Sequence, residues 1–210
     1  MNTPHQSPLG AASGAVFAIV LVVAAGDGTQ TFSAPRAVAG SVAIALGIPF
    51  IAYLCSLLRA ADTRATWVPA AALVTGVVGL TLKLGSVVPE LAAQRLRIPA
   101  SSPTYQALQQ LSGSATVLCL FPLAMFCTGV AVASFRTRAL PSWLAAAAAV
   151  TAAALAVNGA FLTTDNVPAL LLFIAWVLAA SLYLTVRAVR RPVAVPLATE
   201  AAGQLRVGLT

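Results

Sequence analysis

A single charged residue, Lys83, falls inside one of the long apolar runs of this sequence, five residues before the run ends at Val88. Ser86 follows three residues later and Glu90 seven residues later. Residues at these spacings share one face of a helix, so the three side chains lie together if the helix continues past Pro89. A lysine at this depth can extend to the lipid headgroups, pair with an acid or act on a substrate. The spacing leaves these three alternatives open.

Two further acids and an amide fall on the same predicted side of the membrane as Lys83. Asp27 lies in Gly-Asp-Gly, Asp165 in Thr-Asp-Asn, and Asn158 about four residues before an apolar run ends. Acids that burial keeps protonated can donate a proton to an olefin or an epoxide, as small membrane enzymes that cyclise or isomerise isoprenoids require. Candidate catalytic residues are therefore Glu90, Asp165 and Asp27, and candidate substrate-binding residues include Lys83 and Asn158. Alternatively, both aspartates are simply turn residues.

The composition shows what kind of protein holds these residues. Of 210 residues, 12 are Lys or Arg and five are Asp or Glu; this is 8% charged, against about 25% in an ordinary soluble domain. Hydrophobic residues make up 60%, and the mean hydropathy is +0.92. So few charges cannot cover a soluble fold of this size. The net charge of +7 is spread in ones, twos and threes between apolar runs, which excludes a nucleic-acid footprint. The sequence predicts an integral membrane protein whose partners include membrane lipids.

Six apolar runs approach or exceed the roughly 20 residues that cross a bilayer as a helix. Continuous apolarity of this length excludes the alternating strands of an outer-membrane barrel. No Lys or Arg precedes the first run, so we expect it to stay uncleaved. The sequence thus predicts an all-α, polytopic membrane helix bundle in residues 1–191, with a loosely ordered cytoplasmic tail at 192–210. The predicted transmembrane helices are 9–25, 37–58, 67–88, 111–135, 143–162 and 167–186.

The basic residues predict the orientation of this bundle. If the first helix starts in the cytoplasm, eight arginines are on the inner side and four basic residues on the outer side, as the positive-inside rule requires. The inner set is Arg59, Arg64, Arg136, Arg138, Arg187, Arg190, Arg191 and Arg206. The outer set is Arg36, Lys83, Arg95 and Arg97. Trp67 and Trp143 then lie at the inner interface, which suits their amphipathic rings. We expect both termini to be cytoplasmic, in a bacterial cytoplasmic membrane.

The longest connection, 89–110, is predicted to contain a short interfacial helix at Pro89–Ile98. Its water-facing side would carry Glu90, Gln94 and Arg97, and Arg97 is a third candidate substrate-binding residue. Ser102 before Pro103 predicts a helix cap and first turn. The alternative for this connection is a lid over an outer pocket.

Other motifs point to packing rather than to chemistry. The one histidine, His5, precedes the first run, and there is no metal or phosphate motif, so we expect neither a metal nor a cofactor. Cys55, Cys119 and Cys127 differ in predicted position, which indicates buried, unpaired thiols. The Gly10–Gly14 pair and the alanines of 145–154 permit close helix contact inside the bundle or, alternatively, with a second copy or another membrane protein.

One segment carries a resemblance to known proteins. Residues 121–145, FPLAMFCTGVAVASFRTRALPSWLA, join an F-P-L-rich helix to a Trp-Leu helix start through an R-T-R-x-L-P hairpin. This resembles uncharacterised bacterial six-helix integral membrane proteins that share a domain of unknown function. The resemblance implies a fold and a membrane location, and it brings no activity with it. Its residues here are Phe121, Pro122, Arg136, Arg138, Leu140, Pro141, Trp143 and Leu144.

Three functions remain open from the sequence. The leading hypothesis is a membrane protein without catalysis, acting as a structural or accessory component. The second is a small membrane-embedded enzyme that acts on a lipid or isoprenoid through its outer-side acids. The third is a small transporter or channel subunit, although the predicted span centres offer few polar groups to coordinate an ion. Acids that converge on one cavity would favour the enzyme.

The predicted orientation can be tested with reporters fused after Arg191. Six spans from a cytoplasmic start return the chain to the cytoplasm, where green fluorescent protein fluoresces and alkaline phosphatase stays inactive. We therefore expect a fluorescent first fusion and an inactive second one, measured in intact cells. An active phosphatase at this position would contradict the six-span topology.

Overall fold

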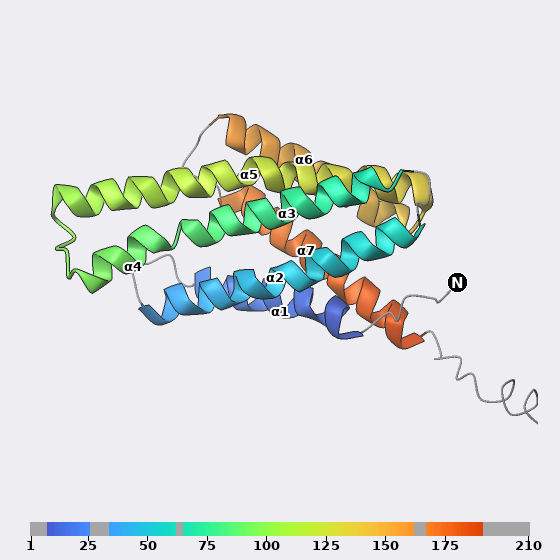
Figure 1. The fold of residues 1–210 in the computed structure, drawn as a ribbon, viewed down its shortest axis with the longest axis horizontal. Helices are drawn as coiled ribbons and strands as arrows, with labels where there is room; N and C mark the ends of the chain where they lie inside the picture. The colour runs from blue at the N-terminus through green and yellow to red at the C-terminus, as the bar shows by residue number, and fades with distance from the viewer. Residues whose placement is uncertain (1–7, 26–33, 62–64, 162–166, 191–210) are drawn as a thin grey trace, which may run out of the picture.

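The computed structural model describes residues 8–25, 34–61, 65–161 and 167–190, and these residues contain helices and no strand (Figure 1). Within them the helices are α1 (Pro8–Ala25), α2 (Ala34–Ala61), α3 (Trp67–Gly85), α4 (Val88–Arg95), α5 (Pro103–Thr137), α6 (Ser142–Ala160) and α7 (Val167–Arg190). The predicted all-α bundle is confirmed. Asp27, Asp165, Arg64, Arg191, Arg206 and the tail at 192–210 lie outside the described residues.

The helices have the length and apolarity of membrane spans. In the described residues, five stretches are long and apolar enough to cross a membrane: α2, α3 together with α4, α5, α6 and α7. The remaining predicted span, the first in the chain, is α1, which has 18 residues, or about 27 Å at 1.5 Å per residue, against a hydrocarbon core of about 30 Å. The length and apolarity of these helices therefore indicate a multi-pass membrane protein.

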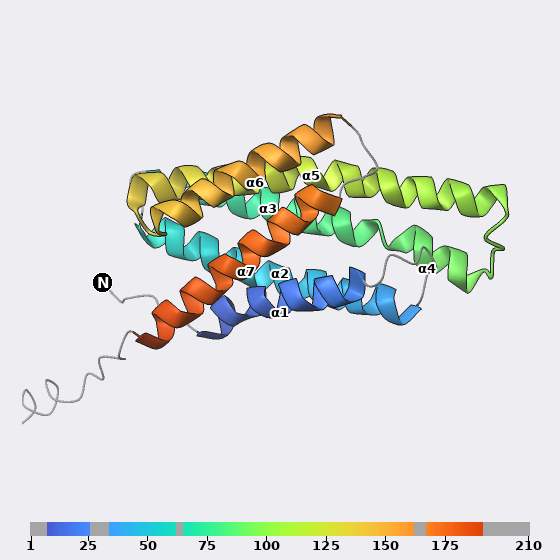
Figure 2. The same cartoon turned by 180° about the vertical axis from the view of Figure 1, so that it is seen from behind.

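Consecutive long helices run antiparallel and close into a ring. In space α1 contacts α2 and α7, α3 contacts α2 and α5, and α6 contacts α5 and α7 (Figures 1 and 2). The beginning of α1 and the end of α7 consequently lie at the same end of the bundle. The interior is filled by apolar side chains, of which Phe50, Phe126 and Phe173 are the largest that are fully buried.

Helix α7 closes this ring through two hydrogen bonds to its neighbours. The Ser181 hydroxyl donates to the Ala11 carbonyl oxygen of α1. The Trp176 indole Nε1 donates to the Leu144 carbonyl oxygen of α6 at 3.2 Å. Both donors are buried, where an unpaired polar group is costly, so the bonds fix how α7 is rotated against its neighbours.

The hairpin at residues 136–141, which carries the resemblance, is held by hydrogen bonds and buried side chains. Arg138 adopts the left-handed conformation, with φ of 54°, and its N–H donates to the Ser134 carbonyl oxygen at 2.8 Å. This closes the end of α5 and turns the chain, and Ala139 and Leu140 are then buried. Arg187 Nη1 of α7 donates to the Ala139 carbonyl oxygen at 2.7 Å. The motif therefore joins three helices at one end of the bundle.

Small residues serve packing within the bundle. A Cβ added at Gly10 would meet Tyr53, and one at Gly14 would meet Phe50, so this pair lets α1 approach α2 closely. Cys55, Cys119 and Cys127 are buried and free, as predicted.

The helices differ in length from several of the predicted spans, and α5 shows the largest difference. Helix α5 begins at Pro103, eight residues before the predicted span, because the Ser102 side chain accepts from the Tyr105 N–H at 3.1 Å and caps it there. Apolar runs locate only the part of a helix in hydrocarbon, whereas all 35 residues of α5 extend about 52 Å. Helix α4 follows α3 and packs beside this added length (Figures 1 and 2). It does not fold back as a lid.

The contact between α3 and α5 yields a stability prediction. A Cβ at Gly129 would lie 2.9 Å from Ala72 Cβ, a rigid neighbour, so Gly129→Ala must push the helices apart and is expected to cost about 1–3 kcal/mol. Gly113, on the same helix, has nothing within 4 Å of an added Cβ. Gly113→Ala should leave stability unchanged or raise it by up to about 1 kcal/mol, since alanine favours helix. Thermal unfolding in detergent measures both, and equal effects would contradict the predicted contact.

Candidate functional site

Lys83 lies against α5, where α3 ends. Its Nζ donates to Thr116 Oγ1 at 3.0 Å, and the side chain is partly buried. The ammonium group thus turns toward a neighbouring helix, which differs from the alternative in which it extends to the headgroups. A charge-assisted hydrogen bond of this kind ties α3 to α5.

Ser112 of α5 joins the break between α3 and α4. Its hydroxyl oxygen lies 2.8 Å from the Ser86 carbonyl oxygen and 3.0 Å from Glu90 Oε1. The Ser86 hydroxyl donates in turn to the Lys83 carbonyl oxygen at 2.7 Å. Pro89, which has no N–H, lies at this break in the helix, and the Ser112 hydroxyl contacts the carbonyl oxygen of the buried Ser86 there. Because a hydroxyl carries one hydrogen, Ser112 can donate fully to only one of its two acceptors at a time.

These contacts define one polar cluster, which we call the α3–α5 cluster: Lys83, Ser86, Glu90, Ser112 and Thr116. The predicted common face of Lys83, Ser86 and Glu90 is therefore present, although the helix breaks between them. Ser112 and Thr116 were missed. Their only sequence signal is a pair of hydroxyls four residues apart, which share a face of α5.

Two other residues of the connection lie apart from this cluster. Gln94 was predicted to face water, but its Nε2 atom is buried and has no hydrogen-bond partner among the described residues. The prediction failed because α4 packs beside α5 instead of lying free at an interface. Arg97 is exposed after the end of α4, with φ of 49°, and makes none of the cluster's hydrogen bonds. The structure therefore does not bring Arg97 to Lys83 and Glu90.

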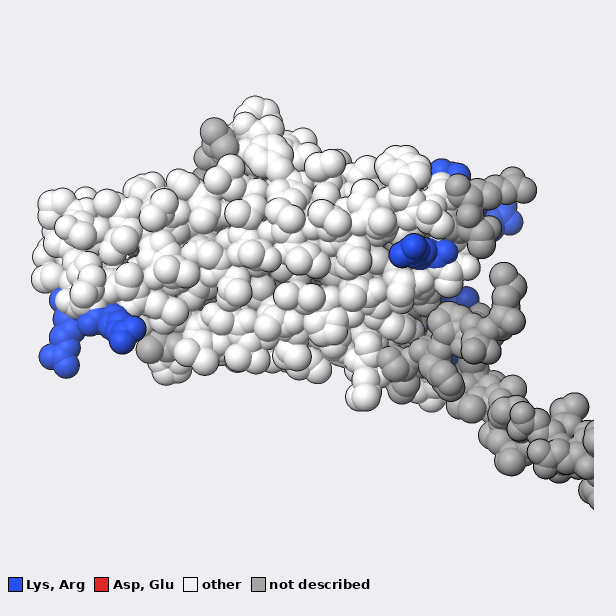
Figure 3. Space-filling model, in the orientation of Figure 1, with Lys and Arg blue, Asp and Glu red and all other residues white. Residues whose placement is uncertain are grey.

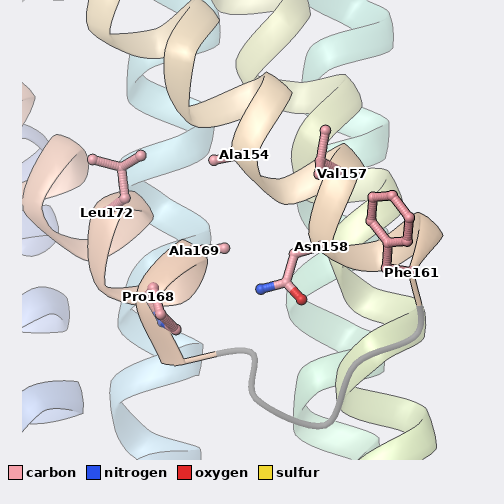
Figure 4. A pocket seen from close by; sticks show the side chains of 7 residues that line it. All are labelled: Ala154, Val157, Asn158, Phe161, Pro168, Ala169 and Leu172. Atoms are coloured by element: carbon pink, nitrogen blue, oxygen red, sulfur yellow. The ribbon is translucent and has the colours of Figure 1, made fainter.

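Asn158 lies at a different place, in a groove between α6 and α7 of about 410 Å³ (Figure 4). Because α5 lies between α3 and α6 in the ring, the structure places Asn158 apart from Lys83 and Glu90. Asp27 and Asp165 lie outside the described residues. Apart from Asn158 the lining is apolar: Ala154, Val157, Phe161, Pro168, Ala169 and Leu172.

A second groove, of about 520 Å³, lies between α5 and α6. Its α6 wall consists of Ala149, Ala152, Ala153 and Ala156, and its α5 wall includes Thr128 as its one polar residue. No Lys, Arg, Asp or Glu lines either of these two grooves. In the described part of the chain there is also no group of three or more His, Cys, Asp or Glu residues that could bind a metal ion.

Comparison with protein-family models, with curated proteins and with solved structures gave no match for this chain. The arrangement of the described residues is thus the basis for any functional proposal. That arrangement places Lys83 and Glu90 between helices, and it leaves the two described grooves lined almost entirely by apolar side chains.

The α3–α5 cluster predicts a stabilising role for Ser112. Ser112→Ala removes the buried hydroxyl that contacts the Ser86 carbonyl oxygen and Glu90 Oε1. It is expected to lower the free energy of unfolding by about 0.5–2 kcal/mol. Ser114→Ala is the matched control, because that exposed hydroxyl bonds only within its own helix, to the Gln110 carbonyl oxygen. It should leave the unfolding temperature unchanged. Identical unfolding curves for the two variants in detergent would contradict a role for the cluster.

Proposed function

We propose that this chain is an integral protein of the bacterial cytoplasmic membrane that acts as a structural or accessory component, without catalysis of its own. The observation that carries this proposal is the placement of Lys83 and Glu90. Each hydrogen-bonds to a hydroxyl of α5, and neither lines either of the two described grooves. Charges used in this way hold helices together.

The distribution of arginines supports an orientation with both termini in the cytoplasm. One end of the bundle carries the described arginines that end α2, α5 and α7 and begin the hairpin: Arg59, Arg136, Arg138, Arg187 and Arg190. The other end carries Lys83, Arg95 and Arg97, and Arg36 belongs to the first turn of α2, which begins at that end. On the face in Figure 3, basic side chains lie at both ends and the band between them is uncharged. Trp67 and Trp143 are exposed at the arginine-rich end, as interfacial residues would be.

The alternatives need features that the described residues do not provide. An enzyme of the cyclase or isomerase type needs acids that converge on a cavity. Glu90 is the one acid in the described residues, and it contacts Ser112 between helices. A transporter needs polar groups along a path, whereas the two described grooves contain Asn158 and Thr128 as their polar residues. Membership in the resembling six-helix family remains a prediction.

A variant of Glu90 separates a structural role from a catalytic one. Glu90→Gln keeps an oxygen acceptor for Ser112 but removes the acid, so a protein without catalysis at Glu90 should keep its cellular function. Ser112→Ala, the matched control, weakens the same contact and leaves the carboxyl group in place. Each variant replaces the chromosomal copy, and growth is compared with the amount of folded protein in the membrane.

We expect Glu90→Gln to match the wild type, and Ser112→Ala to lose function only in proportion to the folded protein lost. A Glu90→Gln protein that is present at the normal level but without function would overturn the proposal. That result would point to acid chemistry at this residue.

A further inference from the structure

Helix α4 turns its one acid toward the bundle. Glu90 and Gln94, four residues apart, share the side of α4 that packs on α5. Glu90 Oε1 lies 3.0 Å from the Ser112 hydroxyl, and the Gln94 Nε2 atom is buried. The negative charge of α4 is therefore directed to α5 and away from the outward side of the helix.

The outward side of α4 changes from apolar to basic along the helix. Val88, Leu91 and Arg95 follow one another at intervals of three and four residues, so they share one side, and all three are exposed. Leu96 and Arg97 are exposed directly after the helix end. Neither guanidinium group hydrogen-bonds or ion-pairs with another described residue. Figure 3 shows basic side chains at this end of the molecule and no acid beside them on the face in view.

The position of α4 along the bundle corresponds to the lipid headgroups. Trp67–Arg95, the stretch that α3 and α4 form together, has 29 residues, or about 43 Å at the helical rise. The hydrocarbon core takes about 30 Å of this length, and a bilayer with its headgroups is about 40–45 Å thick. If α3 crosses the core, α4 lies in the headgroup layer, with Val88 and Leu91 next to the hydrocarbon and the two arginines further out.

The backbone of Arg97 is strained. Its φ is 49°, and the Ile98 N–H next to it donates to the Ala93 carbonyl oxygen at 3.0 Å, which closes the end of α4. Glycine is the usual residue at such a helix end, because a side chain in the left-handed conformation crowds the following carbonyl oxygen. The chain thus keeps a positive charge at a position where glycine would be the less strained residue, which points to a use of the guanidinium group outside the fold.

We infer that the outward side of α4 binds anionic phospholipids, with Arg95 and Arg97 contacting their phosphate groups and with Val88 and Leu91 against the acyl chains next to the glycerol. A guanidinium group donates two parallel hydrogen bonds to a phosphate, and a lipid of net negative charge also balances the positive charge of this side. Carboxylates of an acidic protein segment are the alternative anions. The exposed apolar pair on the same side, at the level where the hydrocarbon begins, favours a lipid.

The inference rests on the membrane placement in the proposed function, and in the orientation proposed there the lipids belong to the outer leaflet. It does not depend on whether Glu90 has chemistry, so the Glu90→Gln test and the test below can fail separately.

Two photoreactive lipids test the inference on the full chain in nanodiscs. Phosphatidylglycerol is anionic and phosphatidylcholine is zwitterionic, and each carries a diazirine at the same acyl position next to the glycerol. After irradiation and digestion, mass spectrometry measures how strongly each lipid labels residues 88–98. We expect stronger labelling by phosphatidylglycerol. Arg95→Gln and Arg97→Gly should each lower the ratio of the two labelling yields by about fivefold, the effect of one arginine at an anionic surface.

Arg97→Gly separates lipid binding from stability, because it removes the charge and also relieves the backbone strain. Its unfolding temperature should equal or exceed that of the wild type while the labelling ratio falls. Arg138→Gly is the matched control. Arg138 is also exposed and left-handed, with φ of 54°, but lies at the opposite end of the bundle, so its loss should not change the labelling of residues 88–98.

Equal labelling of residues 88–98 by the two lipids in the wild type would overturn the inference. A ratio that neither Arg95→Gln nor Arg97→Gly changes, or that Arg138→Gly lowers as much as they do, would also overturn it. A photoreactive amino acid in place of Leu96 tests the alternative partner in intact cells. We expect an adduct of lipid mass there, and an adduct with another protein would contradict a lipid site.

Discussion

In the hydrocarbon of a membrane, each polar group of the chain has to find a partner within the protein. Many hydroxyls do so locally: Thr75, Thr128 and Thr151, for example, donate to carbonyl oxygens one turn back on their own helices. Few polar groups therefore remain to link one helix to another. Those that do so, such as Ser181 on Ala11, decide the rotation of whole helices. The ring of helices depends on this small set of bonds, since apolar packing alone fixes rotation less strictly.

The same constraint separates the two candidate regions of the molecule. Lys83 and Glu90 are tolerated in a span because α5 offers them hydroxyls, and this places them between helices. The grooves beside α6 face outward and consist of side chains that need no partner, with Asn158 at the mouth of one. Charge thus serves the assembly of the bundle, and the outward surface is suited to hydrocarbon. A protein organised in this way can bind membrane components without acid–base chemistry.

Particular residues show how far sequence reasoning reached. The Ser102 cap follows from a serine directly before a proline, and the common face of Lys83, Ser86 and Glu90 follows from spacings of three and seven residues; both are present. The predicted span at 111–135 covers only part of α5, because hydropathy measures contact with lipid and not the extent of a helix. The partners Ser112 and Thr116 were missed, since they lie more than 20 residues away along the chain. Asn158 was grouped with Lys83 by depth alone, and depth does not say which helices are neighbours.

The sequence by itself determined that the chain forms apolar helices, where they lie and which ends carry the arginines. These properties depend on local composition and on hydrogen bonds within one segment, so each can be read without knowing the neighbours. Only the tertiary structure decided the order of the helices around the ring, the inward turn of Lys83 and the separation of Asn158 from the α3–α5 cluster. Those features depend on side chains from distant segments that pack and hydrogen-bond to each other. The pattern of residues along a single helix does not specify such partners.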